Sequence, residues 1–143
     1  ADLQAANLEE ADFFEANLKS VNLLRANMQK VDLTKANLQE AVLAMADLGL
    51  ARIWQANLKE ADLYKANLDK ANLYGANLEG ADLLETNFSR AILLETKLKG
   101  ALNLSLRQIS QAMTLHKSEL EEALMGRLQA DYPNLLARPK SGE

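Results

Sequence analysis

The sequence contains no cysteine, only two prolines, one histidine and one tryptophan, and aromatic residues make up 5% of its 143 residues. Without cysteine it has neither disulfides nor thiolate metal sites. It has no apolar run near the roughly 18 residues that a membrane-spanning helix needs. It also lacks a Gly-rich phosphate loop, a histidine pair for a metal and a Cys nucleophile. We therefore predict that it is not an enzyme and has no cofactor, metal site or membrane span.

Neither sign of charge dominates. The 16 Lys and Arg residues and the 20 Asp and Glu residues give a net charge of −4 and alternate along the chain. Proteins that bind nucleic acid concentrate basic residues on one face. Nucleic acid is therefore not an expected partner.

What the sequence does have is a five-residue repeat. A large apolar residue occupies every fifth position from 3 to 98, with sixteen leucines and the exceptions Phe13, Met28, Ile53 and Phe88. Two residues before each lies alanine, replaced only by Val21, Val31, Thr86 and Thr96. The residue between them is Asn or Asp in sixteen of the twenty words.

This period excludes a single helix and a flat strand. On a helix a step of five residues turns roughly 140° past a full revolution, so the leucines would spiral around it. On a strand, residues five apart would face opposite sides. A short extended piece followed by a corner satisfies the pattern, with Asn or Asp hydrogen-bonded to the backbone beside that corner.

The residue after each large one indicates four sides per coil, because its character repeats every twenty residues. Residues 1–101 then form an all-β solenoid of about five stacked coils. Its predicted core includes Leu3, Leu8, Phe13, Leu18, Leu58, Leu63, Leu68, Leu73, Leu78 and Phe88.

The tandem word A(N/D)LXX over residues 1–101 resembles the pentapeptide repeat proteins. The resemblance implies a right-handed quadrilateral β-helix. It also implies a family that is numerous in cyanobacteria and mostly without assigned activity. The location stays open: the protein is either cytoplasmic, or exported to the periplasm or thylakoid lumen after removal of a signal peptide.

The repeat breaks at residues 101–105, where Asn103 takes the place of the large residue. Ser105 with Gln108, and Ser118 with Glu121, have the spacing of capping boxes. They predict a hairpin of two helices within residues 102–131, with Met113 on the first and His116 near its end. This hairpin either covers the last coil or forms a partner-binding groove. Residues 132–143 are expected to be a loosely ordered tail.

No cap precedes Ala1. Either upstream residues cover the first coil, or two copies associate through it as a homo-oligomer.

Exposed aromatic residues are the candidate functional feature. Trp54 and Tyr74 share an outer column with Phe14 and Leu94, and Tyr64 lies in the column on the opposite side, with Leu24 and Leu84. Arg52, Trp54, Tyr64 and Tyr74 are the candidate protein-binding residues of a rigid scaffold. Packing that only stiffens the rod is the alternative interpretation.

A second hypothesis comes from family members that resemble a DNA duplex and inhibit type II topoisomerases. Such a mimic needs a strongly acidic face. Residues 1–101 hold fifteen acidic and eleven basic residues, with Lys19, Lys59 and Lys99 on one side, so the charge balance disfavours mimicry.

Overall fold

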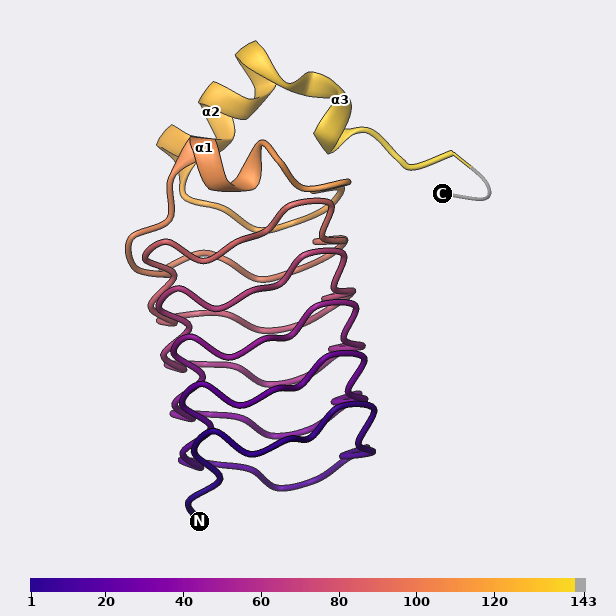
Figure 1. The fold of residues 1–143 in the computed structure, drawn as a ribbon. Coiled ribbons are helices and arrows are strands. Elements are labelled where there is room, and N and C mark those ends of the chain that lie inside the picture. Colours follow the sequence, from indigo (N-terminus) through magenta and orange to yellow (C-terminus); the bar gives the residue numbers. More distant parts are fainter. Residues whose placement is uncertain (141–143) are drawn as a thin grey trace.

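The computed structural model describes residues 1–140 as a rod of stacked coils with three helices at its C-terminal end (Figure 1). Parallel bridges join residues twenty apart, from Asp2 with Asn22 to Asp82 with Leu102. This register puts four five-residue words in each coil, as the column pattern predicted. The bridges are isolated, and no extended strand forms within residues 1–140, because each word turns a corner after about three extended residues.

The corners depend on the last residue of each word. All of these residues up to position 100 have positive φ, between 54° and 62° at the non-glycine positions. The alanine of the next word donates back to the large residue, as from Ala6 N to Leu3 O at 3.0 Å. This geometry is that of a type II turn. A non-glycine residue in the left-handed region costs about 1–2 kcal/mol, so other interactions must hold each corner.

Backbone hydrogen bonds between coils supply that restraint. The large residue and the corner residue both donate to the next coil, as from Leu3 N to Asn22 O at 2.7 Å and from Ala5 N to Leu24 O at 2.8 Å. The Asn or Asp position donates to the previous coil, as from Asn22 N to Ala1 O at 3.1 Å. Each inner coil is therefore bonded on both edges.

The core is a stack of leucine and alanine layers along the axis. Six of the predicted core residues are at most 1% exposed: Leu58, Leu63, Leu68, Leu73, Leu78 and Phe88. The other four, Leu3, Leu8, Phe13 and Leu18, are only half-buried, because no described residue covers the outer face of the first coil. Self-association through this coil stays a prediction.

The sequence pattern predicted that the coils end near Ala101, and this prediction is wrong. Ile92 pairs with Thr114 and Lys97 with Glu119, so bridging continues with a spacing of 22 residues. Leu115 and Leu120 are buried as the large residues of two degenerate words. The two extra residues arise because helix α1 (Leu106–Ile109) replaces one side of this last coil.

Helix α1 begins with the predicted capping box of Ser105 and Gln108, which is confirmed. The Gln108 Nε2 atom also donates to Leu83 O at 2.6 Å and to Thr86 O at 3.1 Å. Ala81 occupies in the preceding word the position that Thr86 has in its own. The Ala81 carbonyl accepts from Leu102 N in the next coil. The side-chain amide therefore takes the place of the backbone donor that the helix removes.

The predicted helix start at Ser118 is wrong. Helix α2 (Glu122–Asp131) begins four residues later, and its N-cap, Glu121, makes no side-chain capping bond. The backbone at this point still belongs to the last coil, because Glu119 N donates to Thr96 O at 2.9 Å. The Glu121 carboxylate accepts from Gly100 N at 2.7 Å, which satisfies one edge donor of the coil below.

The segment after α2 is more ordered than predicted. Helix α3 (Pro133–Leu136) packs on the last coil, where Leu115 N donates to Leu135 O at 2.7 Å. The Nδ1 atom of His116 lies 3.0 Å from Leu136 O, so this residue holds α3 from a corner of the coil and does not end a helix. The cap is therefore three short helices and a degenerate coil, and residues 141–143 of the expected tail lie outside the described residues.

The packing of the core predicts that substitutions at both apolar positions of a word lower the free energy of unfolding, by different amounts. Leu58→Ala should lower the free energy of unfolding by about 2–5 kcal/mol through the cavity it leaves. Ala56→Leu should lower it by about 1–3 kcal/mol through overpacking. Chemical denaturation measures both, with the exposed Lys59→Ala as control. Unchanged stability of both core variants would contradict the buried stack.

The cap predicts a specific role for the Gln108 amide. Gln108→Glu keeps the acceptor for Ser105 but removes the donor to Leu83 O and Thr86 O. We therefore expect the free energy of unfolding, measured by chemical denaturation, to fall by about 1–3 kcal/mol. Gln111→Glu is the matched control, because Gln111 is exposed and its Oε1 atom only accepts, from Ser89 Oγ. Equal effects of the two changes would show that the two carbonyls do not need this donor.

Candidate protein-binding surface

One side of the rod carries three of the four residues that the sequence singled out. We define the tryptophan side by positions 12 and 14 and every twentieth residue after them, up to Leu94. Arg52, Trp54 and Tyr74 all lie on it. The rings of Trp54 and Tyr74, one coil apart, are edge to face with centroids 6.3 Å apart and an interplanar angle of 69°.

Exposure differs along this side. Phe14 is 52% and Trp54 45% exposed, whereas Tyr74 and Leu94 are half-buried. Large apolar side chains with this much exposure mark candidate contact sites when they cluster. The backbone bonds between coils fix their spacing, so the column is rigid before any partner arrives.

Arg52 stands where most words have Asn or Asp. Its Nη2 atom lies 3.2 Å from Asp32 Oδ2 in the preceding coil. Asp32 also accepts from Thr34 N at 3.0 Å. Hydrogen bonds from the Thr34 side chain and backbone, with Arg52 as a smaller contribution, hold the pKa of the Asp32 carboxyl below its usual value.

The structure does not bring Tyr64 together with the other three. It follows Trp54 by ten residues, half of a twenty-residue coil, and so lies on the opposite side with Leu24 and Leu84. The Lys65 ammonium sits 5.3 Å from the centre of the Tyr64 ring and 3.6 Å from the Glu85 carboxylate. Tyr64 first, and Glu85 after it, raise the pKa of Lys65. The four candidates therefore belong to two surfaces.

The Asn and Asp row serves the backbone. Its Oδ1 atoms accept from the N–H two residues on, as from Phe14 N to Asp12 at 2.9 Å and from Glu79 N to Asn77 at 2.9 Å. Neighbouring members also bond to each other, as from Asn87 to Asn67 at 3.0 Å. These contacts brace the corners and leave the row little capacity for a ligand.

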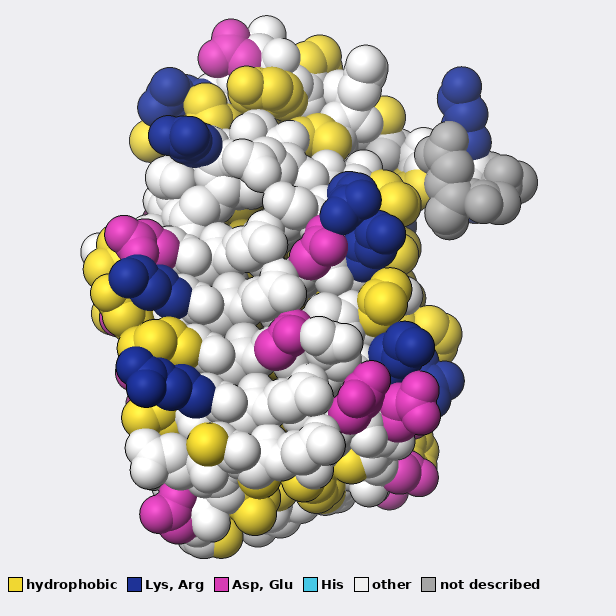
Figure 2. Space-filling model, viewed as in Figure 1, with side chains coloured by type: hydrophobic (Ala, Val, Ile, Leu, Met, Phe, Trp, Pro, Cys, Tyr) yellow, Lys and Arg dark blue, Asp and Glu magenta, His cyan; other side chains and the backbone are white. Residues whose placement is uncertain are grey.

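Charged side chains of both signs lie side by side on the face of the rod shown in Figure 2. Ion pairs join successive coils, such as Arg90 with Asp69 at 2.9 Å. Within residues 1–140 no group of three or more metal-ligating side chains gathers. No helix of the described part is long and apolar enough to span a bilayer.

Sequence reasoning missed a pocket at the C-terminal end of the tryptophan side. It is lined by Ile92, Leu94, Met113, Thr114, Asn134, Ala137, Arg138, Pro139 and Lys140. The local pattern assigns Met113 to a helix and residues 138–140 to a loose tail, so neither is expected beside the rod. The signal that could have pointed here is Ile92, an apolar residue in the Asn or Asp position.

The lowered pKa of Asp32 predicts a pH-dependent contribution to stability. A carboxyl whose pKa is lower in the folded state stabilises that state above its unfolded pKa of about 3.9. Asp32→Asn should therefore reduce the free energy of unfolding at neutral pH. The difference from wild type should disappear as the pH falls through the folded-state pKa of Asp32.

Two variants separate the causes of this shift. Thr34→Val removes the hydroxyl donor, and Arg52→Met removes the cation while leaving the hydroxyl in place. Thr34 is the larger cause of the lowered pKa. Replacing Thr34 should therefore shrink the pH-dependent stability difference that Asp32→Asn produces more than replacing Arg52 does. Denaturation curves from pH 2 to 7 measure it. A difference that does not change with pH would contradict the assignment.

Comparison with known proteins agrees with the five-residue repeat. The family described as pentapeptide repeats (8 copies) matches residues 1–34, 16–55, 36–73, 46–83 and 66–102. A search of curated proteins found no match.

Two solved structures are similar. A pentapeptide repeat protein of the Arabidopsis thaliana thylakoid lumen is 27% identical with a TM-score of 0.62, over 63% of each chain. HetL, a pentapeptide repeat protein involved in heterocyst differentiation regulation in the cyanobacterium Nostoc sp. strain PCC 7120, is 33% identical with a TM-score of 0.51, over 83% of this chain. The chain spans 63% and 57% of their respective lengths. With a match over residues 1–102 and these neighbours, the chain belongs to the pentapeptide repeat family.

Proposed function

We propose that the chain is a right-handed quadrilateral β-helix that acts as a non-catalytic scaffold and binds another protein through its tryptophan side. The observation that carries this proposal is the exposed Trp54, which packs edge to face on Tyr74 and stays 45% exposed. Tryptophan, tyrosine and arginine are the residue types that dominate the energy of protein interfaces. Arg52 completes this set two residues from Trp54, with its side chain 63% exposed.

Rigidity favours binding through this surface. Association loses free energy when flexible side chains and loops must be ordered. Here the backbone positions of Arg52, Trp54 and Tyr74 are fixed by bonds to both neighbouring coils, for example from Lys35 N to Trp54 O at 2.8 Å and from Gln55 N to Tyr74 O at 2.7 Å. The backbone of the aromatic pair is therefore already ordered before a partner binds.

Packing of the aromatic residues that only stiffens the rod explains the geometry less well than partner binding does. The edge-to-face contact buries one part of each ring, yet nearly half of Trp54 still faces solvent. The side chains before and after it in the column, Thr34 and Tyr74, do not cover it. HetL is involved in regulating a differentiation process, and a regulatory role of this kind fits a scaffold that binds a partner.

The test compares two sides of the same rod. Wild-type protein, a Trp54→Ala/Tyr74→Ala variant and a Tyr64→Ala/Leu84→Ala control are immobilised and exposed to an extract of the source organism. Circular dichroism and melting curves first confirm that all three are folded. We expect a specific protein to bind wild type and control but not the tryptophan-side variant, and to bind again when purified.

Other results would contradict the proposal. Retention of the same proteins by all three forms, or by none, would make the aromatic column structural. Loss of the partner with the control only would move the interface to the opposite side. Inhibition of DNA gyrase supercoiling by the pure protein would instead support DNA mimicry, which the mixed charges on the rod disfavour.

A further inference from the structure

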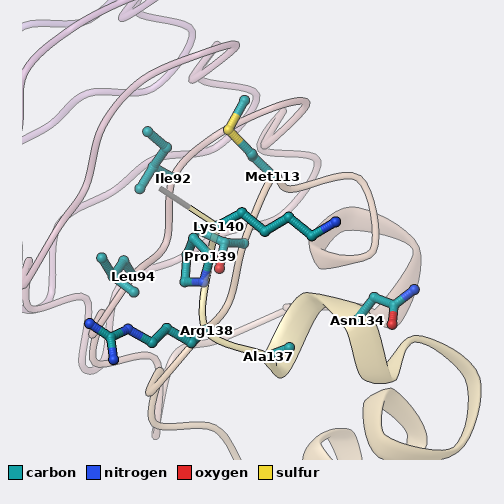
Figure 3. Close-up of a pocket in the computed structure, with 9 residues that line it drawn as sticks. Ile92, Leu94, Met113, Asn134, Ala137, Arg138, Pro139 and Lys140 are labelled. Carbon is teal, nitrogen blue, oxygen red and sulfur yellow. The ribbon is translucent and has the colours of Figure 1, made fainter. Parts of the chain in front are cut away.

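A pocket of about 410 Å³ opens beside the last coils of the tryptophan side. One wall is the rod, and the other is the segment that follows α3, residues 137–140 (Figure 3). Its volume is in the range of sites that hold small ligands or single large side chains. The pocket continues the column of Trp54, Tyr74 and Leu94 towards the C-terminal end of the rod.

The rod wall is apolar. Ile92 and Leu94 are half-buried, and Met113 is 51% exposed. Methionine adapts its shape to different apolar partners. Ile92 occupies a position where Asn or Asp would bond to the backbone, and it presents apolar surface to the pocket instead.

The opposite wall is cationic. Arg138 and Lys140 both line the pocket, and no Asp or Glu within residues 1–140 is among its lining residues. This positive site lies on a chain whose net charge is −4. The Arg138 guanidinium is exposed and forms no ion pair or hydrogen bond with residues 1–140. Arginine pairs with carboxylates through two parallel hydrogen bonds, which makes it the stronger anchor of the two.

We propose that this pocket binds an acidic segment of a partner protein. A large apolar side chain of that segment enters between Ile92, Leu94 and Met113. A neighbouring carboxylate pairs with the Arg138 guanidinium across the pocket, which Lys140 also lines. The choice of a protein as the ligand rests on the function proposed above, whereas its acidic and apolar chemistry is read from the pocket alone.

The position of the pocket favours a peptide over a compact small molecule. Successive coils are about 4.8 Å apart, so Tyr74 and Trp54 lie roughly one and two coil spacings from Leu94 along the column. An extended chain covers about 3.3 Å per residue. A segment anchored in the pocket therefore reaches the aromatic pair within about three or four residues, which joins the two surfaces into one track.

The test selects ligands by their chemistry. A phage-displayed library of random peptides is panned against wild-type protein, and the enriched sequences are read. We expect a consensus in which Asp or Glu adjoins Leu, Phe or another large apolar residue. Labelled peptides from this pool are then titrated by fluorescence anisotropy, and their affinity should fall as salt rises, because exposed ion pairs are screened.

Charge reversal locates the site. Arg138→Glu/Lys140→Glu should weaken the selected peptides about tenfold or more, because like charges then oppose the carboxylate. Lys19→Glu/Lys59→Glu is the matched control: both lysines are exposed on another side, and the net charge changes equally. Replacing the carboxylates of the peptide by amides should cost a similar factor. Trp54 is the only tryptophan, so a change in its emission reports that the peptide reaches the track.

Three results would overturn the proposal: no enrichment, a consensus without carboxylates, or equal weakening by both charge-reversed variants. Capture of the natural partner separates this outcome from failure of the proposed function. A partner lost with Trp54→Ala/Tyr74→Ala but kept by Arg138→Glu/Lys140→Glu leaves the scaffold proposal standing and contradicts the pocket. Acidic peptides that depend on Arg138 and Lys140, with no partner held by Trp54 and Tyr74, support the pocket and contradict binding through the tryptophan side.

Discussion

The left-handed corner that closes every word is the constraint on which the rest of this structure depends. It turns the chain after about three extended residues, so that four words return it to register with the residue twenty positions earlier. Most corner residues are not glycine and are strained there. The bonds to the coils above and below, together with the Asn or Asp side chain three residues earlier, keep them in place. Neither the corner nor the ladder is stable without the other.

This arrangement separates stability from surface identity. The small and large apolar residues of each word pack in the core, and the Asn or Asp side chain hydrogen-bonds to the backbone. The positions beside the corner remain free to carry other chemistry, and side chains twenty residues apart form columns. A Trp and a Tyr in one column, with an Arg beside them, thereby become a preformed surface at little cost in conformational entropy.

The C-terminal end shows how strongly unpaired backbone groups govern the fold. Helix α1 removes donors that a regular word would supply, and the Gln108 amide replaces one of them. The Glu121 side chain and the Leu135 carbonyl satisfy two donors at the upper edge. The same segment also places Arg138 and Lys140 opposite Ile92 and Leu94, so the cap completes the pocket that it borders.

The repeat by itself determined the period, the four sides, the buried large apolar residues from Leu58 to Phe88, and which aromatic residues share a column, because each of these follows from residue spacing. The capping box at Ser105 was also readable, since it is local. The tertiary structure alone decided that Ser118 continues a coil, that His116 holds α3, and that the chain after α3 faces Ile92. Each depends on backbone groups distant in sequence: ladder bonds to Thr96 and Leu98 outweigh a local helix signal, and no local pattern encodes such partners.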